Sequence, residues 1–353
     1  MGSPDLVKTL VTIAAYLLAN KGGLSLPPSG PAGARAVVGY YSEYFQGESA
    51  PYQSLKNNLK TLTAVAPFAY YLNGAGEVSG TRPTQAVSMA HAGGLKVLAL
   101  VHNFTRQNGF EAGTAHRLLS SPAARERAAG NLLSLVRQRG YHGINLDLEN
   151  VPASDRANLT AFVRRLAEVF RPHGLLVTAS IPAKTSDNRN SNWSGAFDYA
   201  ALGAYLDQVM LMSYDENGAN GPPGPVASLP WVERVVRYAR GLIPSRKILI
   251  GLAVYGYDWP LGKAGGRGRE FKDIQGIIDR HGVAPKWDSA AKVPYLRYTK
   301  SGQPRVVWYE NSWSAAYKLD LVNRYDLGGV AIWRLGGEDP RLWPVIRQKF
   351  GKA

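Results

Sequence analysis

Short apolar runs alternate with amphipathic stretches along the chain from residue 36 to its end. Eight of these runs have the length of strands and are rich in β-branched, aromatic and aliphatic residues. They cover residues 36–41, 64–72, 96–101, 143–149, 175–181, 208–214, 247–255 and 328–333. This pattern predicts eight β-strands.

The stretches between these runs have the periodicity of helices. Residues 154–173 repeat apolar side chains at the i, i+3, i+4, i+7 spacing of a helix with one buried face. The repeating residues are Leu159, Phe162, Val163, Leu166, Val169 and Phe170. Ser154 or Asp155 can cap the start of this helix, and Gly174 follows its end. Residues 230–241 repeat the pattern.

Apolar strands that alternate with helices predict one parallel sheet buried on both faces. A closed (β/α)8 barrel, the TIM barrel, is the natural arrangement of eight such units, and roughly 250 residues suffice for it. We therefore assign residues 36–353 to a single α/β barrel.

One segment interrupts the alternation after the seventh strand. About fifty extra residues separate Trp259 from the helical pattern at 312–325. They hold the glycine-rich "GKAGGRGRE" (262–270), the helical "FKDIQGIIDRHG" (271–282) and the hairpin-like "YLRYTKSGQPRVVWYE" (295–310). We expect a small α+β insertion at about 260–311, between strand 7 and strand 8, on the rim formed by the βα loops.

The first 35 residues differ from the rest of the chain. Lys8 precedes an apolar run at 9–19, and a Pro/Gly/Ser-rich stretch follows at 26–34. The run is too short to span a bilayer but matches the apolar part of a secretory signal. We therefore expect a signal-like leader and linker at 1–35 and an exported protein of the cell envelope, spore or extracellular space. An amphipathic amino-terminal helix is the alternative, since Asp5 and the missing A-x-A site do not fit a signal.

The overall composition is that of a globular protein, and it excludes several classes of functional site and partner. The chain has no cysteine, which excludes disulfides, thiolate metal sites and cysteine nucleophiles. Its net charge of +15 indicates an anionic partner. Because the basic residues are dispersed, a generally basic surface is favoured over a nucleic-acid groove, and we expect no nucleic-acid partner.

Several chemistries are not indicated by any motif. The six histidines are scattered without metal-ligand spacing, so we expect neither a metal nor a cofactor. The segment "GYDWPLGKA" lacks the spacing of a phosphate loop, and no G-x-S-x-G elbow is present.

The strand at 143–149 carries the candidate chemistry. Asn145, Asp147 and Glu149 alternate with aliphatic residues, so these three side chains face the same way. The alternative is that the acids are solvated loop residues or ion pairs. No Lys or Arg lies within 141–149, and burying unpaired carboxylates costs several kcal/mol. A functional site at the carboxyl end of this strand is therefore favoured.

This strand resembles the signature of glycoside hydrolase family 18, the chitinase-like hydrolases, which is written D-G-x-D-x-D-x-E. In "HGINLDLE", Gly143, Asp147 and Glu149 match the signature. His142 replaces the opening acid, and Asn145 replaces the first acid of the alternating trio.

Further segments are similar to the same family from residue 36 onward. Strand six, "VMLMSYD", is similar to the family's M-x-Y-D segment, which gives Met212, Tyr214 and Asp215. Strand eight, "GGVAIWRLGGED", resembles the segment whose tryptophan forms the floor of the sugar site, here Trp333. Strand one supplies Tyr40, below the acids.

Two segments relate the chain to one branch of the family. "GLAVYGYDW" and "VWYENSWSAAYKLDLV" look most like the bacterial branch that includes spore-cortex and peptidoglycan glucosaminidases. The family's usual S-x-G-G on strand three is absent, and "LVHNF" stands in its place.

The resemblance implies substrate-assisted catalysis without an enzymic nucleophile. Glu149 would protonate the glycosidic oxygen and later deprotonate water. Asp147 would accept the N–H of the substrate's acetamido group, whose oxygen attacks C1 to form an oxazolinium ion. Tyr214 would donate to the acetamido carbonyl, Asp215 would contact the substrate, and Trp333 would stack against the sugar.

The remaining candidates are weaker. We assign five further residues to substrate binding: Asn145, Tyr40, Asn103, Tyr257 and Met212. An amide at 145 leaves Asp147 as the only inner anion. Tyr214 and Met212 could instead fill the core, and Trp333 could pack the barrel. Trp308 and Trp313 either line the rim or hold the insertion together.

These features together predict an exported, monomeric, retaining glycosidase. It would cleave β-1,4 bonds next to N-acetylglucosamine in peptidoglycan or spore cortex, in preference to chitin. Contact with a membrane would be limited to the leader. The alternatives are a non-catalytic, lectin-like sugar-binding barrel and a structural protein of the wall or spore coat. Lectin-like relatives typically lack the terminal acid, which is present here as Glu149.

Overall fold

The computed structural model of this chain describes residues 35–45 and 47–351. The expected leader and linker at 1–35 lie outside these residues, apart from Arg35. Among the described residues, no helix combines the length and the apolar character needed to cross a membrane.

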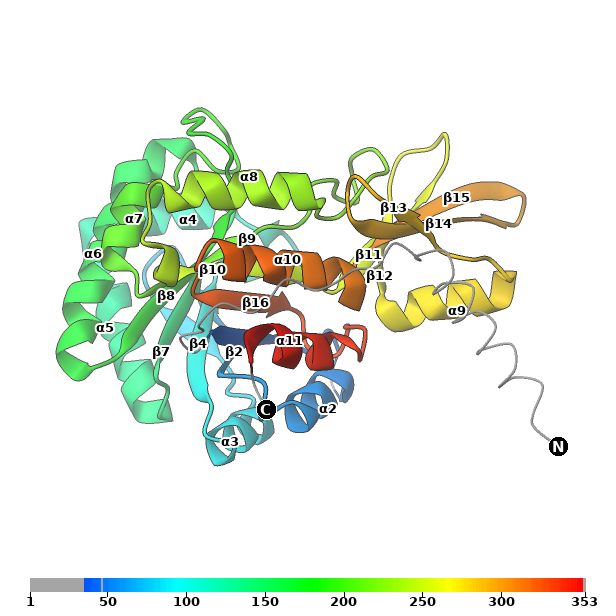
Figure 1. Cartoon of the computed structure of the whole chain (residues 1–353). Helices are drawn as coiled ribbons and strands as arrows, with labels where there is room; N and C mark the ends of the chain where they lie inside the picture. The colour runs from blue at the N-terminus through cyan, green and yellow to red at the C-terminus, as the bar shows by residue number, and fades with distance from the viewer. Residues whose placement is uncertain (1–34, 46, 352–353) are drawn as a thin grey trace. The chain divides into compact units, whose positions relative to one another are not determined.

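Eight parallel strands close into a barrel (Figure 1). They are β1 (Ala36–Tyr41), β2 (Ala64–Leu72), β4 (Lys96–His102), β7 (Gly143–Asp147), β8 (Leu176–Pro182), β9 (Gln208–Met212), β10 (Ile248–Ala253) and β16 (Gly329–Trp333). Their order is β1-β16-β10-β9-β8-β7-β4-β2, and pairing of β1 with β2 closes the ring. The predicted TIM barrel is confirmed, and every strand ends within two residues of its predicted bounds.

Helices cover the outside of the barrel (Figure 1). They are α2 (Ala50–Asn57), α3 (Thr84–Ala92), α4 (Ala112–Ser120), α5 (Pro122–Arg139), α6 (Arg156–Phe170), α7 (Tyr199–Tyr205), α8 (Leu229–Arg240), α10 (Ser312–Arg324) and α11 (Leu342–Phe350). Short additional elements are the strands β3 (Val78–Gly80), β5 (Phe104–Thr105) and β6 (Gly109–Phe110) and the 3-10 turns Ala153–Asp155, Arg171–His173 and Ser245–Lys247.

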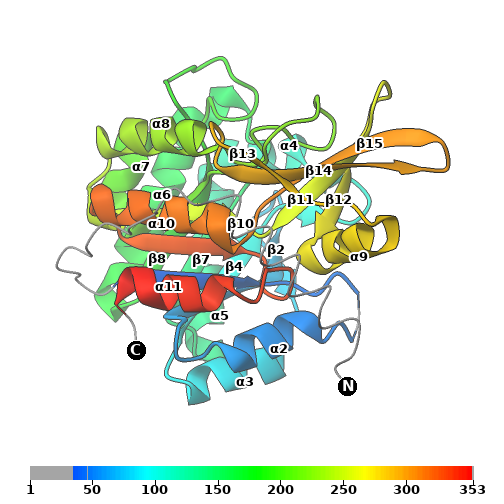
Figure 2. The ribbon, with the colours of Figure 1, turned by 45° about the vertical axis from the view of Figure 1, so that its right-hand side comes forward.

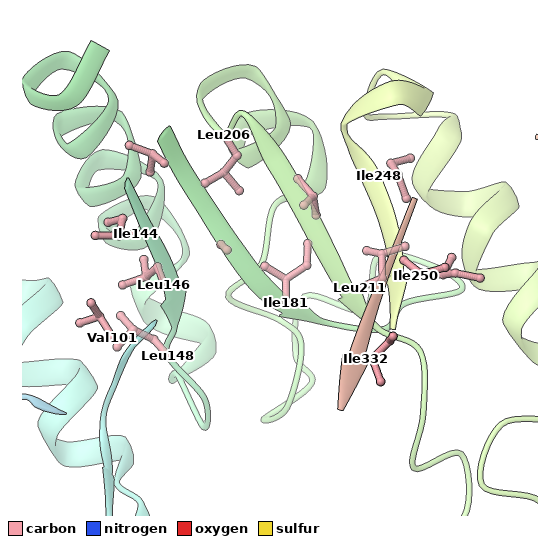
Figure 3. Close-up of a cluster of buried hydrophobic side chains, with 14 of the residues drawn as sticks. Val101, Ile144, Leu146, Leu148, Ile181, Leu206, Leu211, Ile248, Ile250 and Ile332 are labelled. Carbon is pink, nitrogen blue, oxygen red and sulfur yellow. The ribbon is translucent and has the colours of Figure 1, made fainter. Parts of the chain in front are cut away.

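Residues that alternate along each strand pack into two separate layers. On β7, Ile144 and Leu146 point outward, and Leu148 continues this layer toward the helices (Figure 3). The inner layer fills the barrel and contains Val38, Tyr40, Ala64, Ala66, Leu98, Leu100, Met210, Leu249 and Ala331. Each buried aliphatic side chain contributes about 1.5–3 kcal/mol, so this alternation fixes which residues of β7 face the interior.

The expected insertion is a five-stranded antiparallel sheet with one helix (Figure 2). Its elements are β11 (Tyr255–Pro260), β12 (Arg267–Glu270), α9 (Phe271–His281), β13 (Lys286–Asp288), β14 (Val293–Lys300) and β15 (Gln303–Tyr309). Phe271, Ile274 and Ile277 of α9 pack on one face of the sheet. The sheet begins at Tyr255, earlier than the expected start at 260, because β11 follows β10 after a single residue.

Two local features stabilise the insertion. Ser301 and Gly302 link β14 to β15 with φ angles of 50° and 76°, the left-handed backbone of a two-residue hairpin turn. The buried carboxylate of Asp258 accepts hydrogen bonds from Arg305 Nε at 2.7 Å and Tyr298 OH at 2.8 Å. Its charge is also paired with Arg269.

Candidate active site

The polar residues of β7 lie at the carboxyl end of the barrel, level with the ends of neighbouring strands. Asp147 is in register with His102 of β4. On the opposite part of the ring, Trp333 of β16 is in register with Ala253 of β10. Since Leu146 packs in the outer layer, Asn145 and Asp147 on either side of it face the barrel interior.

Asn145 lies at the bottom of the site and is fully buried. Its Nδ2 donates to Thr178 Oγ1 at 3.1 Å and to Met210 Sδ at 2.8 Å, and its Oδ1 accepts from Ser180 Oγ at 2.9 Å. The hydroxyls of Ser180 and Tyr40 are 2.7 Å apart. The expected substrate contact of Asn145 stays a prediction; in the structure its amide is hydrogen-bonded to these buried groups below Asp147.

Asp147 and Glu149 are the two acids at the centre of the site. Burial raises the pKa of Asp147 to about 7. Burial also raises the pKa of Glu149 well above its ordinary value, and the negative charges of Asp147 and Asp215 raise it further. Two carboxyl groups in such surroundings do not both ionise readily, so a protonated carboxyl is available near neutral pH.

Glu149 lies two residues beyond the end of β7, and the side chain of Asn103, directly after the neighbouring strand β4, holds it there. Asn103 Oδ1 accepts the N–H of Glu149 at 3.0 Å, and Asn103 Nδ2 donates to the carbonyl of Glu149 at 2.9 Å. Nδ2 also donates to the carbonyl of Glu111 at 3.2 Å. Asn103 is fully buried and binds the backbone of Glu149, and its expected contact with substrate stays a prediction.

Tyr214 and Asp215 follow β9, which ends at Met212 rather than at the predicted residue 214. Burial raises the pKa of Tyr214 well above its ordinary value, and the charges of Asp147 and Glu149 raise it further. The phenol is therefore a hydrogen-bond donor at neutral pH. Met212, expected to bind substrate, is buried at the end of its strand.

Two tyrosines at the start of the insertion bind Asp215. The hydroxyls of Tyr255 and Tyr257 donate to Asp215 Oδ1 at 2.6 Å and 2.9 Å. The φ angle of Asp215 is 59°, which is uncommon for a residue other than glycine. The sequence placed Tyr257 in the site but did not indicate Tyr255, although both residues belong to the same β11 run.

Gly251 of β10 provides room for Tyr214. A Cβ atom at this position would lie 2.7 Å from Cε1 of Tyr214 and 2.5 Å from the carbonyl oxygen of Leu211. Glycine is therefore required where β10 passes the tyrosine ring.

Trp333 is half-buried at the end of β16 and belongs to a group of aromatic rings. Its ring meets Tyr40 edge-on with centroids 5.5 Å apart and Phe68 edge-on at 5.9 Å. Phe68 stacks on His102 with centroids 4.0 Å apart and an interplanar angle of 9°. Sequence reasoning missed Phe68 and His102, although the position of His102 at the end of a barrel strand is itself a signal of function.

Arg334, which follows Trp333, connects three segments of the rim. Its guanidinium donates to the carbonyl of Ser42 at 2.6 Å, to Glu48 at 2.7 Å and to Glu270 at 2.6 Å. This buried cation joins the β1–α2 loop, the insertion and β16 next to Trp333. The peptide bond between Trp333 and Arg334 is cis.

Within the part of the chain that the structure describes, no group of three or more His, Cys, Asp or Glu residues could hold an ion. The groups that meet here are the carboxyls of Asp147, Glu149 and Asp215 and the hydroxyl of Tyr214, with the aromatic ring of Trp333 at the end of β16.

Comparison with known families and proteins agrees with the barrel fold. The family model described as "Glycosyl hydrolases family 18" matches residues 36–338. An uncharacterized glycosylase of Bacillus subtilis (strain 168), YvbX, is 30% identical over 320 residues, which cover 90% of this chain and 93% of that protein.

Two solved structures are similar over nearly the whole chain. A chitinase from Chromobacterium violaceum ATCC 12472 has a TM-score of 0.84 and 33% identity, and the match covers 91% of this chain and 100% of that chain. The spore cortex-lytic enzyme SleL of Bacillus megaterium QM B1551 has a TM-score of 0.84 and 26% identity, with coverage of 92% and 76%.

Proposed function

Because this chain belongs to glycosyl hydrolase family 18 and is a glycoside hydrolase, we propose that it cleaves β-1,4 bonds next to N-acetylglucosamine with retention of configuration. The substrate's own acetamido oxygen is the nucleophile. The observation that carries this reaction is the meeting of Asp147, Glu149 and Tyr214 at the carboxyl ends of two barrel strands.

Glu149 is the general acid and base. Burial and the charge of Asp147 raise its pKa and so favour the protonated carboxyl, whose proton passes to the glycosidic oxygen as the C1–O bond breaks. The acetamido carbonyl oxygen bonds to C1 and forms an oxazolinium ion. Glu149, now ionised, takes a proton from the water that attacks C1 and reopens the ring, which restores the starting state.

Asp147 and Tyr214 orient the acetamido group. Asp147 accepts its N–H, and the positive charge that develops on the oxazolinium favours the ionised form of this buried carboxyl. Tyr214 donates its hydroxyl to the carbonyl oxygen. Its raised pKa supports this role because the phenol does not ionise in the working range.

The proposed substrate is peptidoglycan or spore cortex in preference to chitin. Support comes from the likeness to the spore cortex-lytic enzyme SleL and from a net charge of +15, which suits an anionic wall polymer. The chain acts as an exported monomer at the cell envelope, at the spore or outside the cell. Residues 36–353 form the catalytic barrel, and residues 1–35 serve as leader and linker.

The test is the release of reducing ends from cortex fragments, vegetative peptidoglycan and chitin. Wild type should release reducing ends from at least one polymer, and Glu149→Gln should lower kcat by about 10³-fold or more because the proton donor is lost. Proton NMR of the first product should show the β-anomer, the mark of retention. Polymer binding by wild type without turnover would instead support the lectin-like alternative.

A further inference from the structure

His102 is a polar residue of the barrel mouth to which the reaction above gives no role. Leu98 and Leu100 of the same strand lie in the inner layer, whereas Val101 lies in the outer layer. The alternation therefore points the His102 side chain into the barrel, in register with Asp147.

The contacts of His102 determine which ring nitrogen carries the proton. The N–H of Phe104 donates to His102 Nδ1 at 3.1 Å, so Nδ1 is an acceptor. Burial lowers the pKa of His102 to about 4, so the ring is neutral at physiological pH. In a neutral imidazole with Nδ1 as acceptor, the proton lies on Nε2, which is then a hydrogen-bond donor.

The Nε2 atom is available to a ligand. No hydrogen bond to it is found within residues 35–45 and 47–351, and it is not among the unpartnered polar atoms sealed from solvent. The ring stacks on Phe68, and Phe68 meets Trp333 edge-on. His102 therefore lies beside the aromatic platform and on the strand next to the two acids.

We propose that His102 binds the substrate through Nε2–H, which donates to an uncharged oxygen, a hydroxyl or amide carbonyl, of a sugar held against Trp333. This role rests on the proposed glycosidase function. The ring stack on Phe68 fixes the imidazole plane, and the bond from Phe104 fixes the tautomer. The donor is therefore oriented before the saccharide arrives, which reduces the entropy lost on binding.

A purely structural role, in which His102 only accepts the N–H of Phe104, is the competing explanation. Two substitutions separate these roles. In His102→Asn, the amide oxygen can replace Nδ1 as acceptor for Phe104, but no N–H reaches the position of Nε2. In His102→Gln, the longer side chain carries an N–H to that position.

Both variants are assayed with the soluble pentamer of N-acetylglucosamine and with cortex fragments. For His102→Asn we expect KM to rise about tenfold, as for one lost hydrogen bond, with kcat within about twofold of wild type. His102→Gln should restore KM to within about threefold. Both variants lose the ring stack on Phe68, and His102→Gln also loses the acceptor for Phe104, so Tm should fall by a few degrees while both proteins stay folded.

An unchanged KM in His102→Asn on both substrates would overturn the proposal, and so would an equal loss of kcat in both variants. Titration of the pentamer into Glu149→Gln and into the double variant with His102→Asn measures binding without turnover. If wild type hydrolyses neither substrate, the proposed reaction fails. The titration then still decides whether His102 binds a saccharide.

Discussion

Asn103 and Glu149, 46 residues apart in the sequence, are joined by two hydrogen bonds between one side-chain amide and the backbone N–H and carbonyl of the glutamate. The strand β7 has already ended at Asp147, so sheet pairing no longer fixes Glu149. The amide of Asn103 replaces the missing strand partner. It thereby fixes the position of Glu149, the proposed proton donor, at the carboxyl end of the barrel.

Asn103→Asp should lower kcat while leaving KM nearly unchanged. The substitution replaces the Nδ2 donor with an oxygen that repels the carbonyl of Glu149, so the acid is misplaced. We expect a loss of about 10–100-fold, the size typical of a small displacement of a catalytic group. Steady-state kinetics on cortex fragments measures this change.

Asn131→Asp provides the matched control. Asn131 donates to the carbonyl of Gly76 at 2.9 Å, on the outer helix α5 and remote from the acids. Its replacement should leave kcat within about twofold of wild type. Equal losses in the two variants would show that Asn103 has no special relation to Glu149.

Asn145→Asp should move the pH–rate profile toward higher pH. The substitution places a second buried acid beneath Asp147, which raises the pKa of both carboxyls when they compete for protons. The acidic limb of the profile, which is set by ionisation of Asp147, then moves to higher pH. The added negative charge also raises the pKa of Glu149 and moves the basic limb to higher pH. The dependence of kcat/KM on pH measures both limbs.

Ser180→Ala is the control for this change. It removes the hydroxyl that links Asn145 to Tyr40 without adding charge. Both limbs of the pH–rate profile of Ser180→Ala should lie at the same pH as in wild type, even if the maximal rate falls. A profile of Asn145→Asp that coincides with wild type in a folded protein would contradict the electrostatic account.

Asp147→Asn should stabilise the protein at neutral pH and not at acidic pH. Burial raises the pKa of Asp147 from 3.8 to about 7, so the folded state binds a proton that the unfolded state has released. Stability therefore falls as pH rises from about 4 to about 7, and ionised Asp147 costs on the order of 2–4 kcal/mol above that range. The amide does not ionise and removes this cost.

Chemical denaturation of wild type and Asp147→Asn at pH 4 and pH 8 measures the difference in the free energy of unfolding. The two proteins should differ at pH 8 and converge at pH 4. Asp279→Asn, at an exposed position of α9, should show no such pH-dependent gain. A gain of equal size at both pH values would mean that the raised pKa is not the cause.

Trp308→Ala should raise KM for long polysaccharide substrates more than for short oligosaccharides. Tyr257, Trp308 and Tyr295 are direct partners on three adjacent strands of the insertion, so they share one face of its sheet. The rings of Tyr295 and Trp308 stack with centroids 4.7 Å apart. Since the hydroxyl of Tyr257 already binds Asp215, this row of rings leads away from the acids.

We expect a several-fold rise in KM for cortex polymer, in line with about 1 kcal/mol for one lost aromatic contact, and little change for a disaccharide. Trp287→Ala is the control, because Trp287 packs against Tyr317 of α10 instead. If Trp308→Ala raised KM equally for cortex polymer and for the disaccharide, the row of Tyr257, Trp308 and Tyr295 would not be a binding surface for long chains.

Most strands and helices could be predicted from the local pattern of apolar and polar residues, because the period and the apolar content of a segment do not depend on the rest of the chain. The strand bounds at 36–41 and 64–72 were predicted without error, since both runs end where polar or turn residues begin. The strand at 143–149 was predicted too long, because alternation continues through Glu149 after sheet pairing has stopped. Pairing depends on the neighbouring strand, which the local pattern does not contain.

The sequence by itself determined that Asn145 and Asp147 face one way, because residues two apart on a strand share a face whatever the rest of the chain does. Only the tertiary structure decided which groups meet them: the amide of Asn103, the stack of Phe68 on His102, and the two tyrosines on Asp215. These partners come from segments far apart in the sequence. They are brought together by closure of the barrel and by the register between its strands, which no short stretch of sequence specifies.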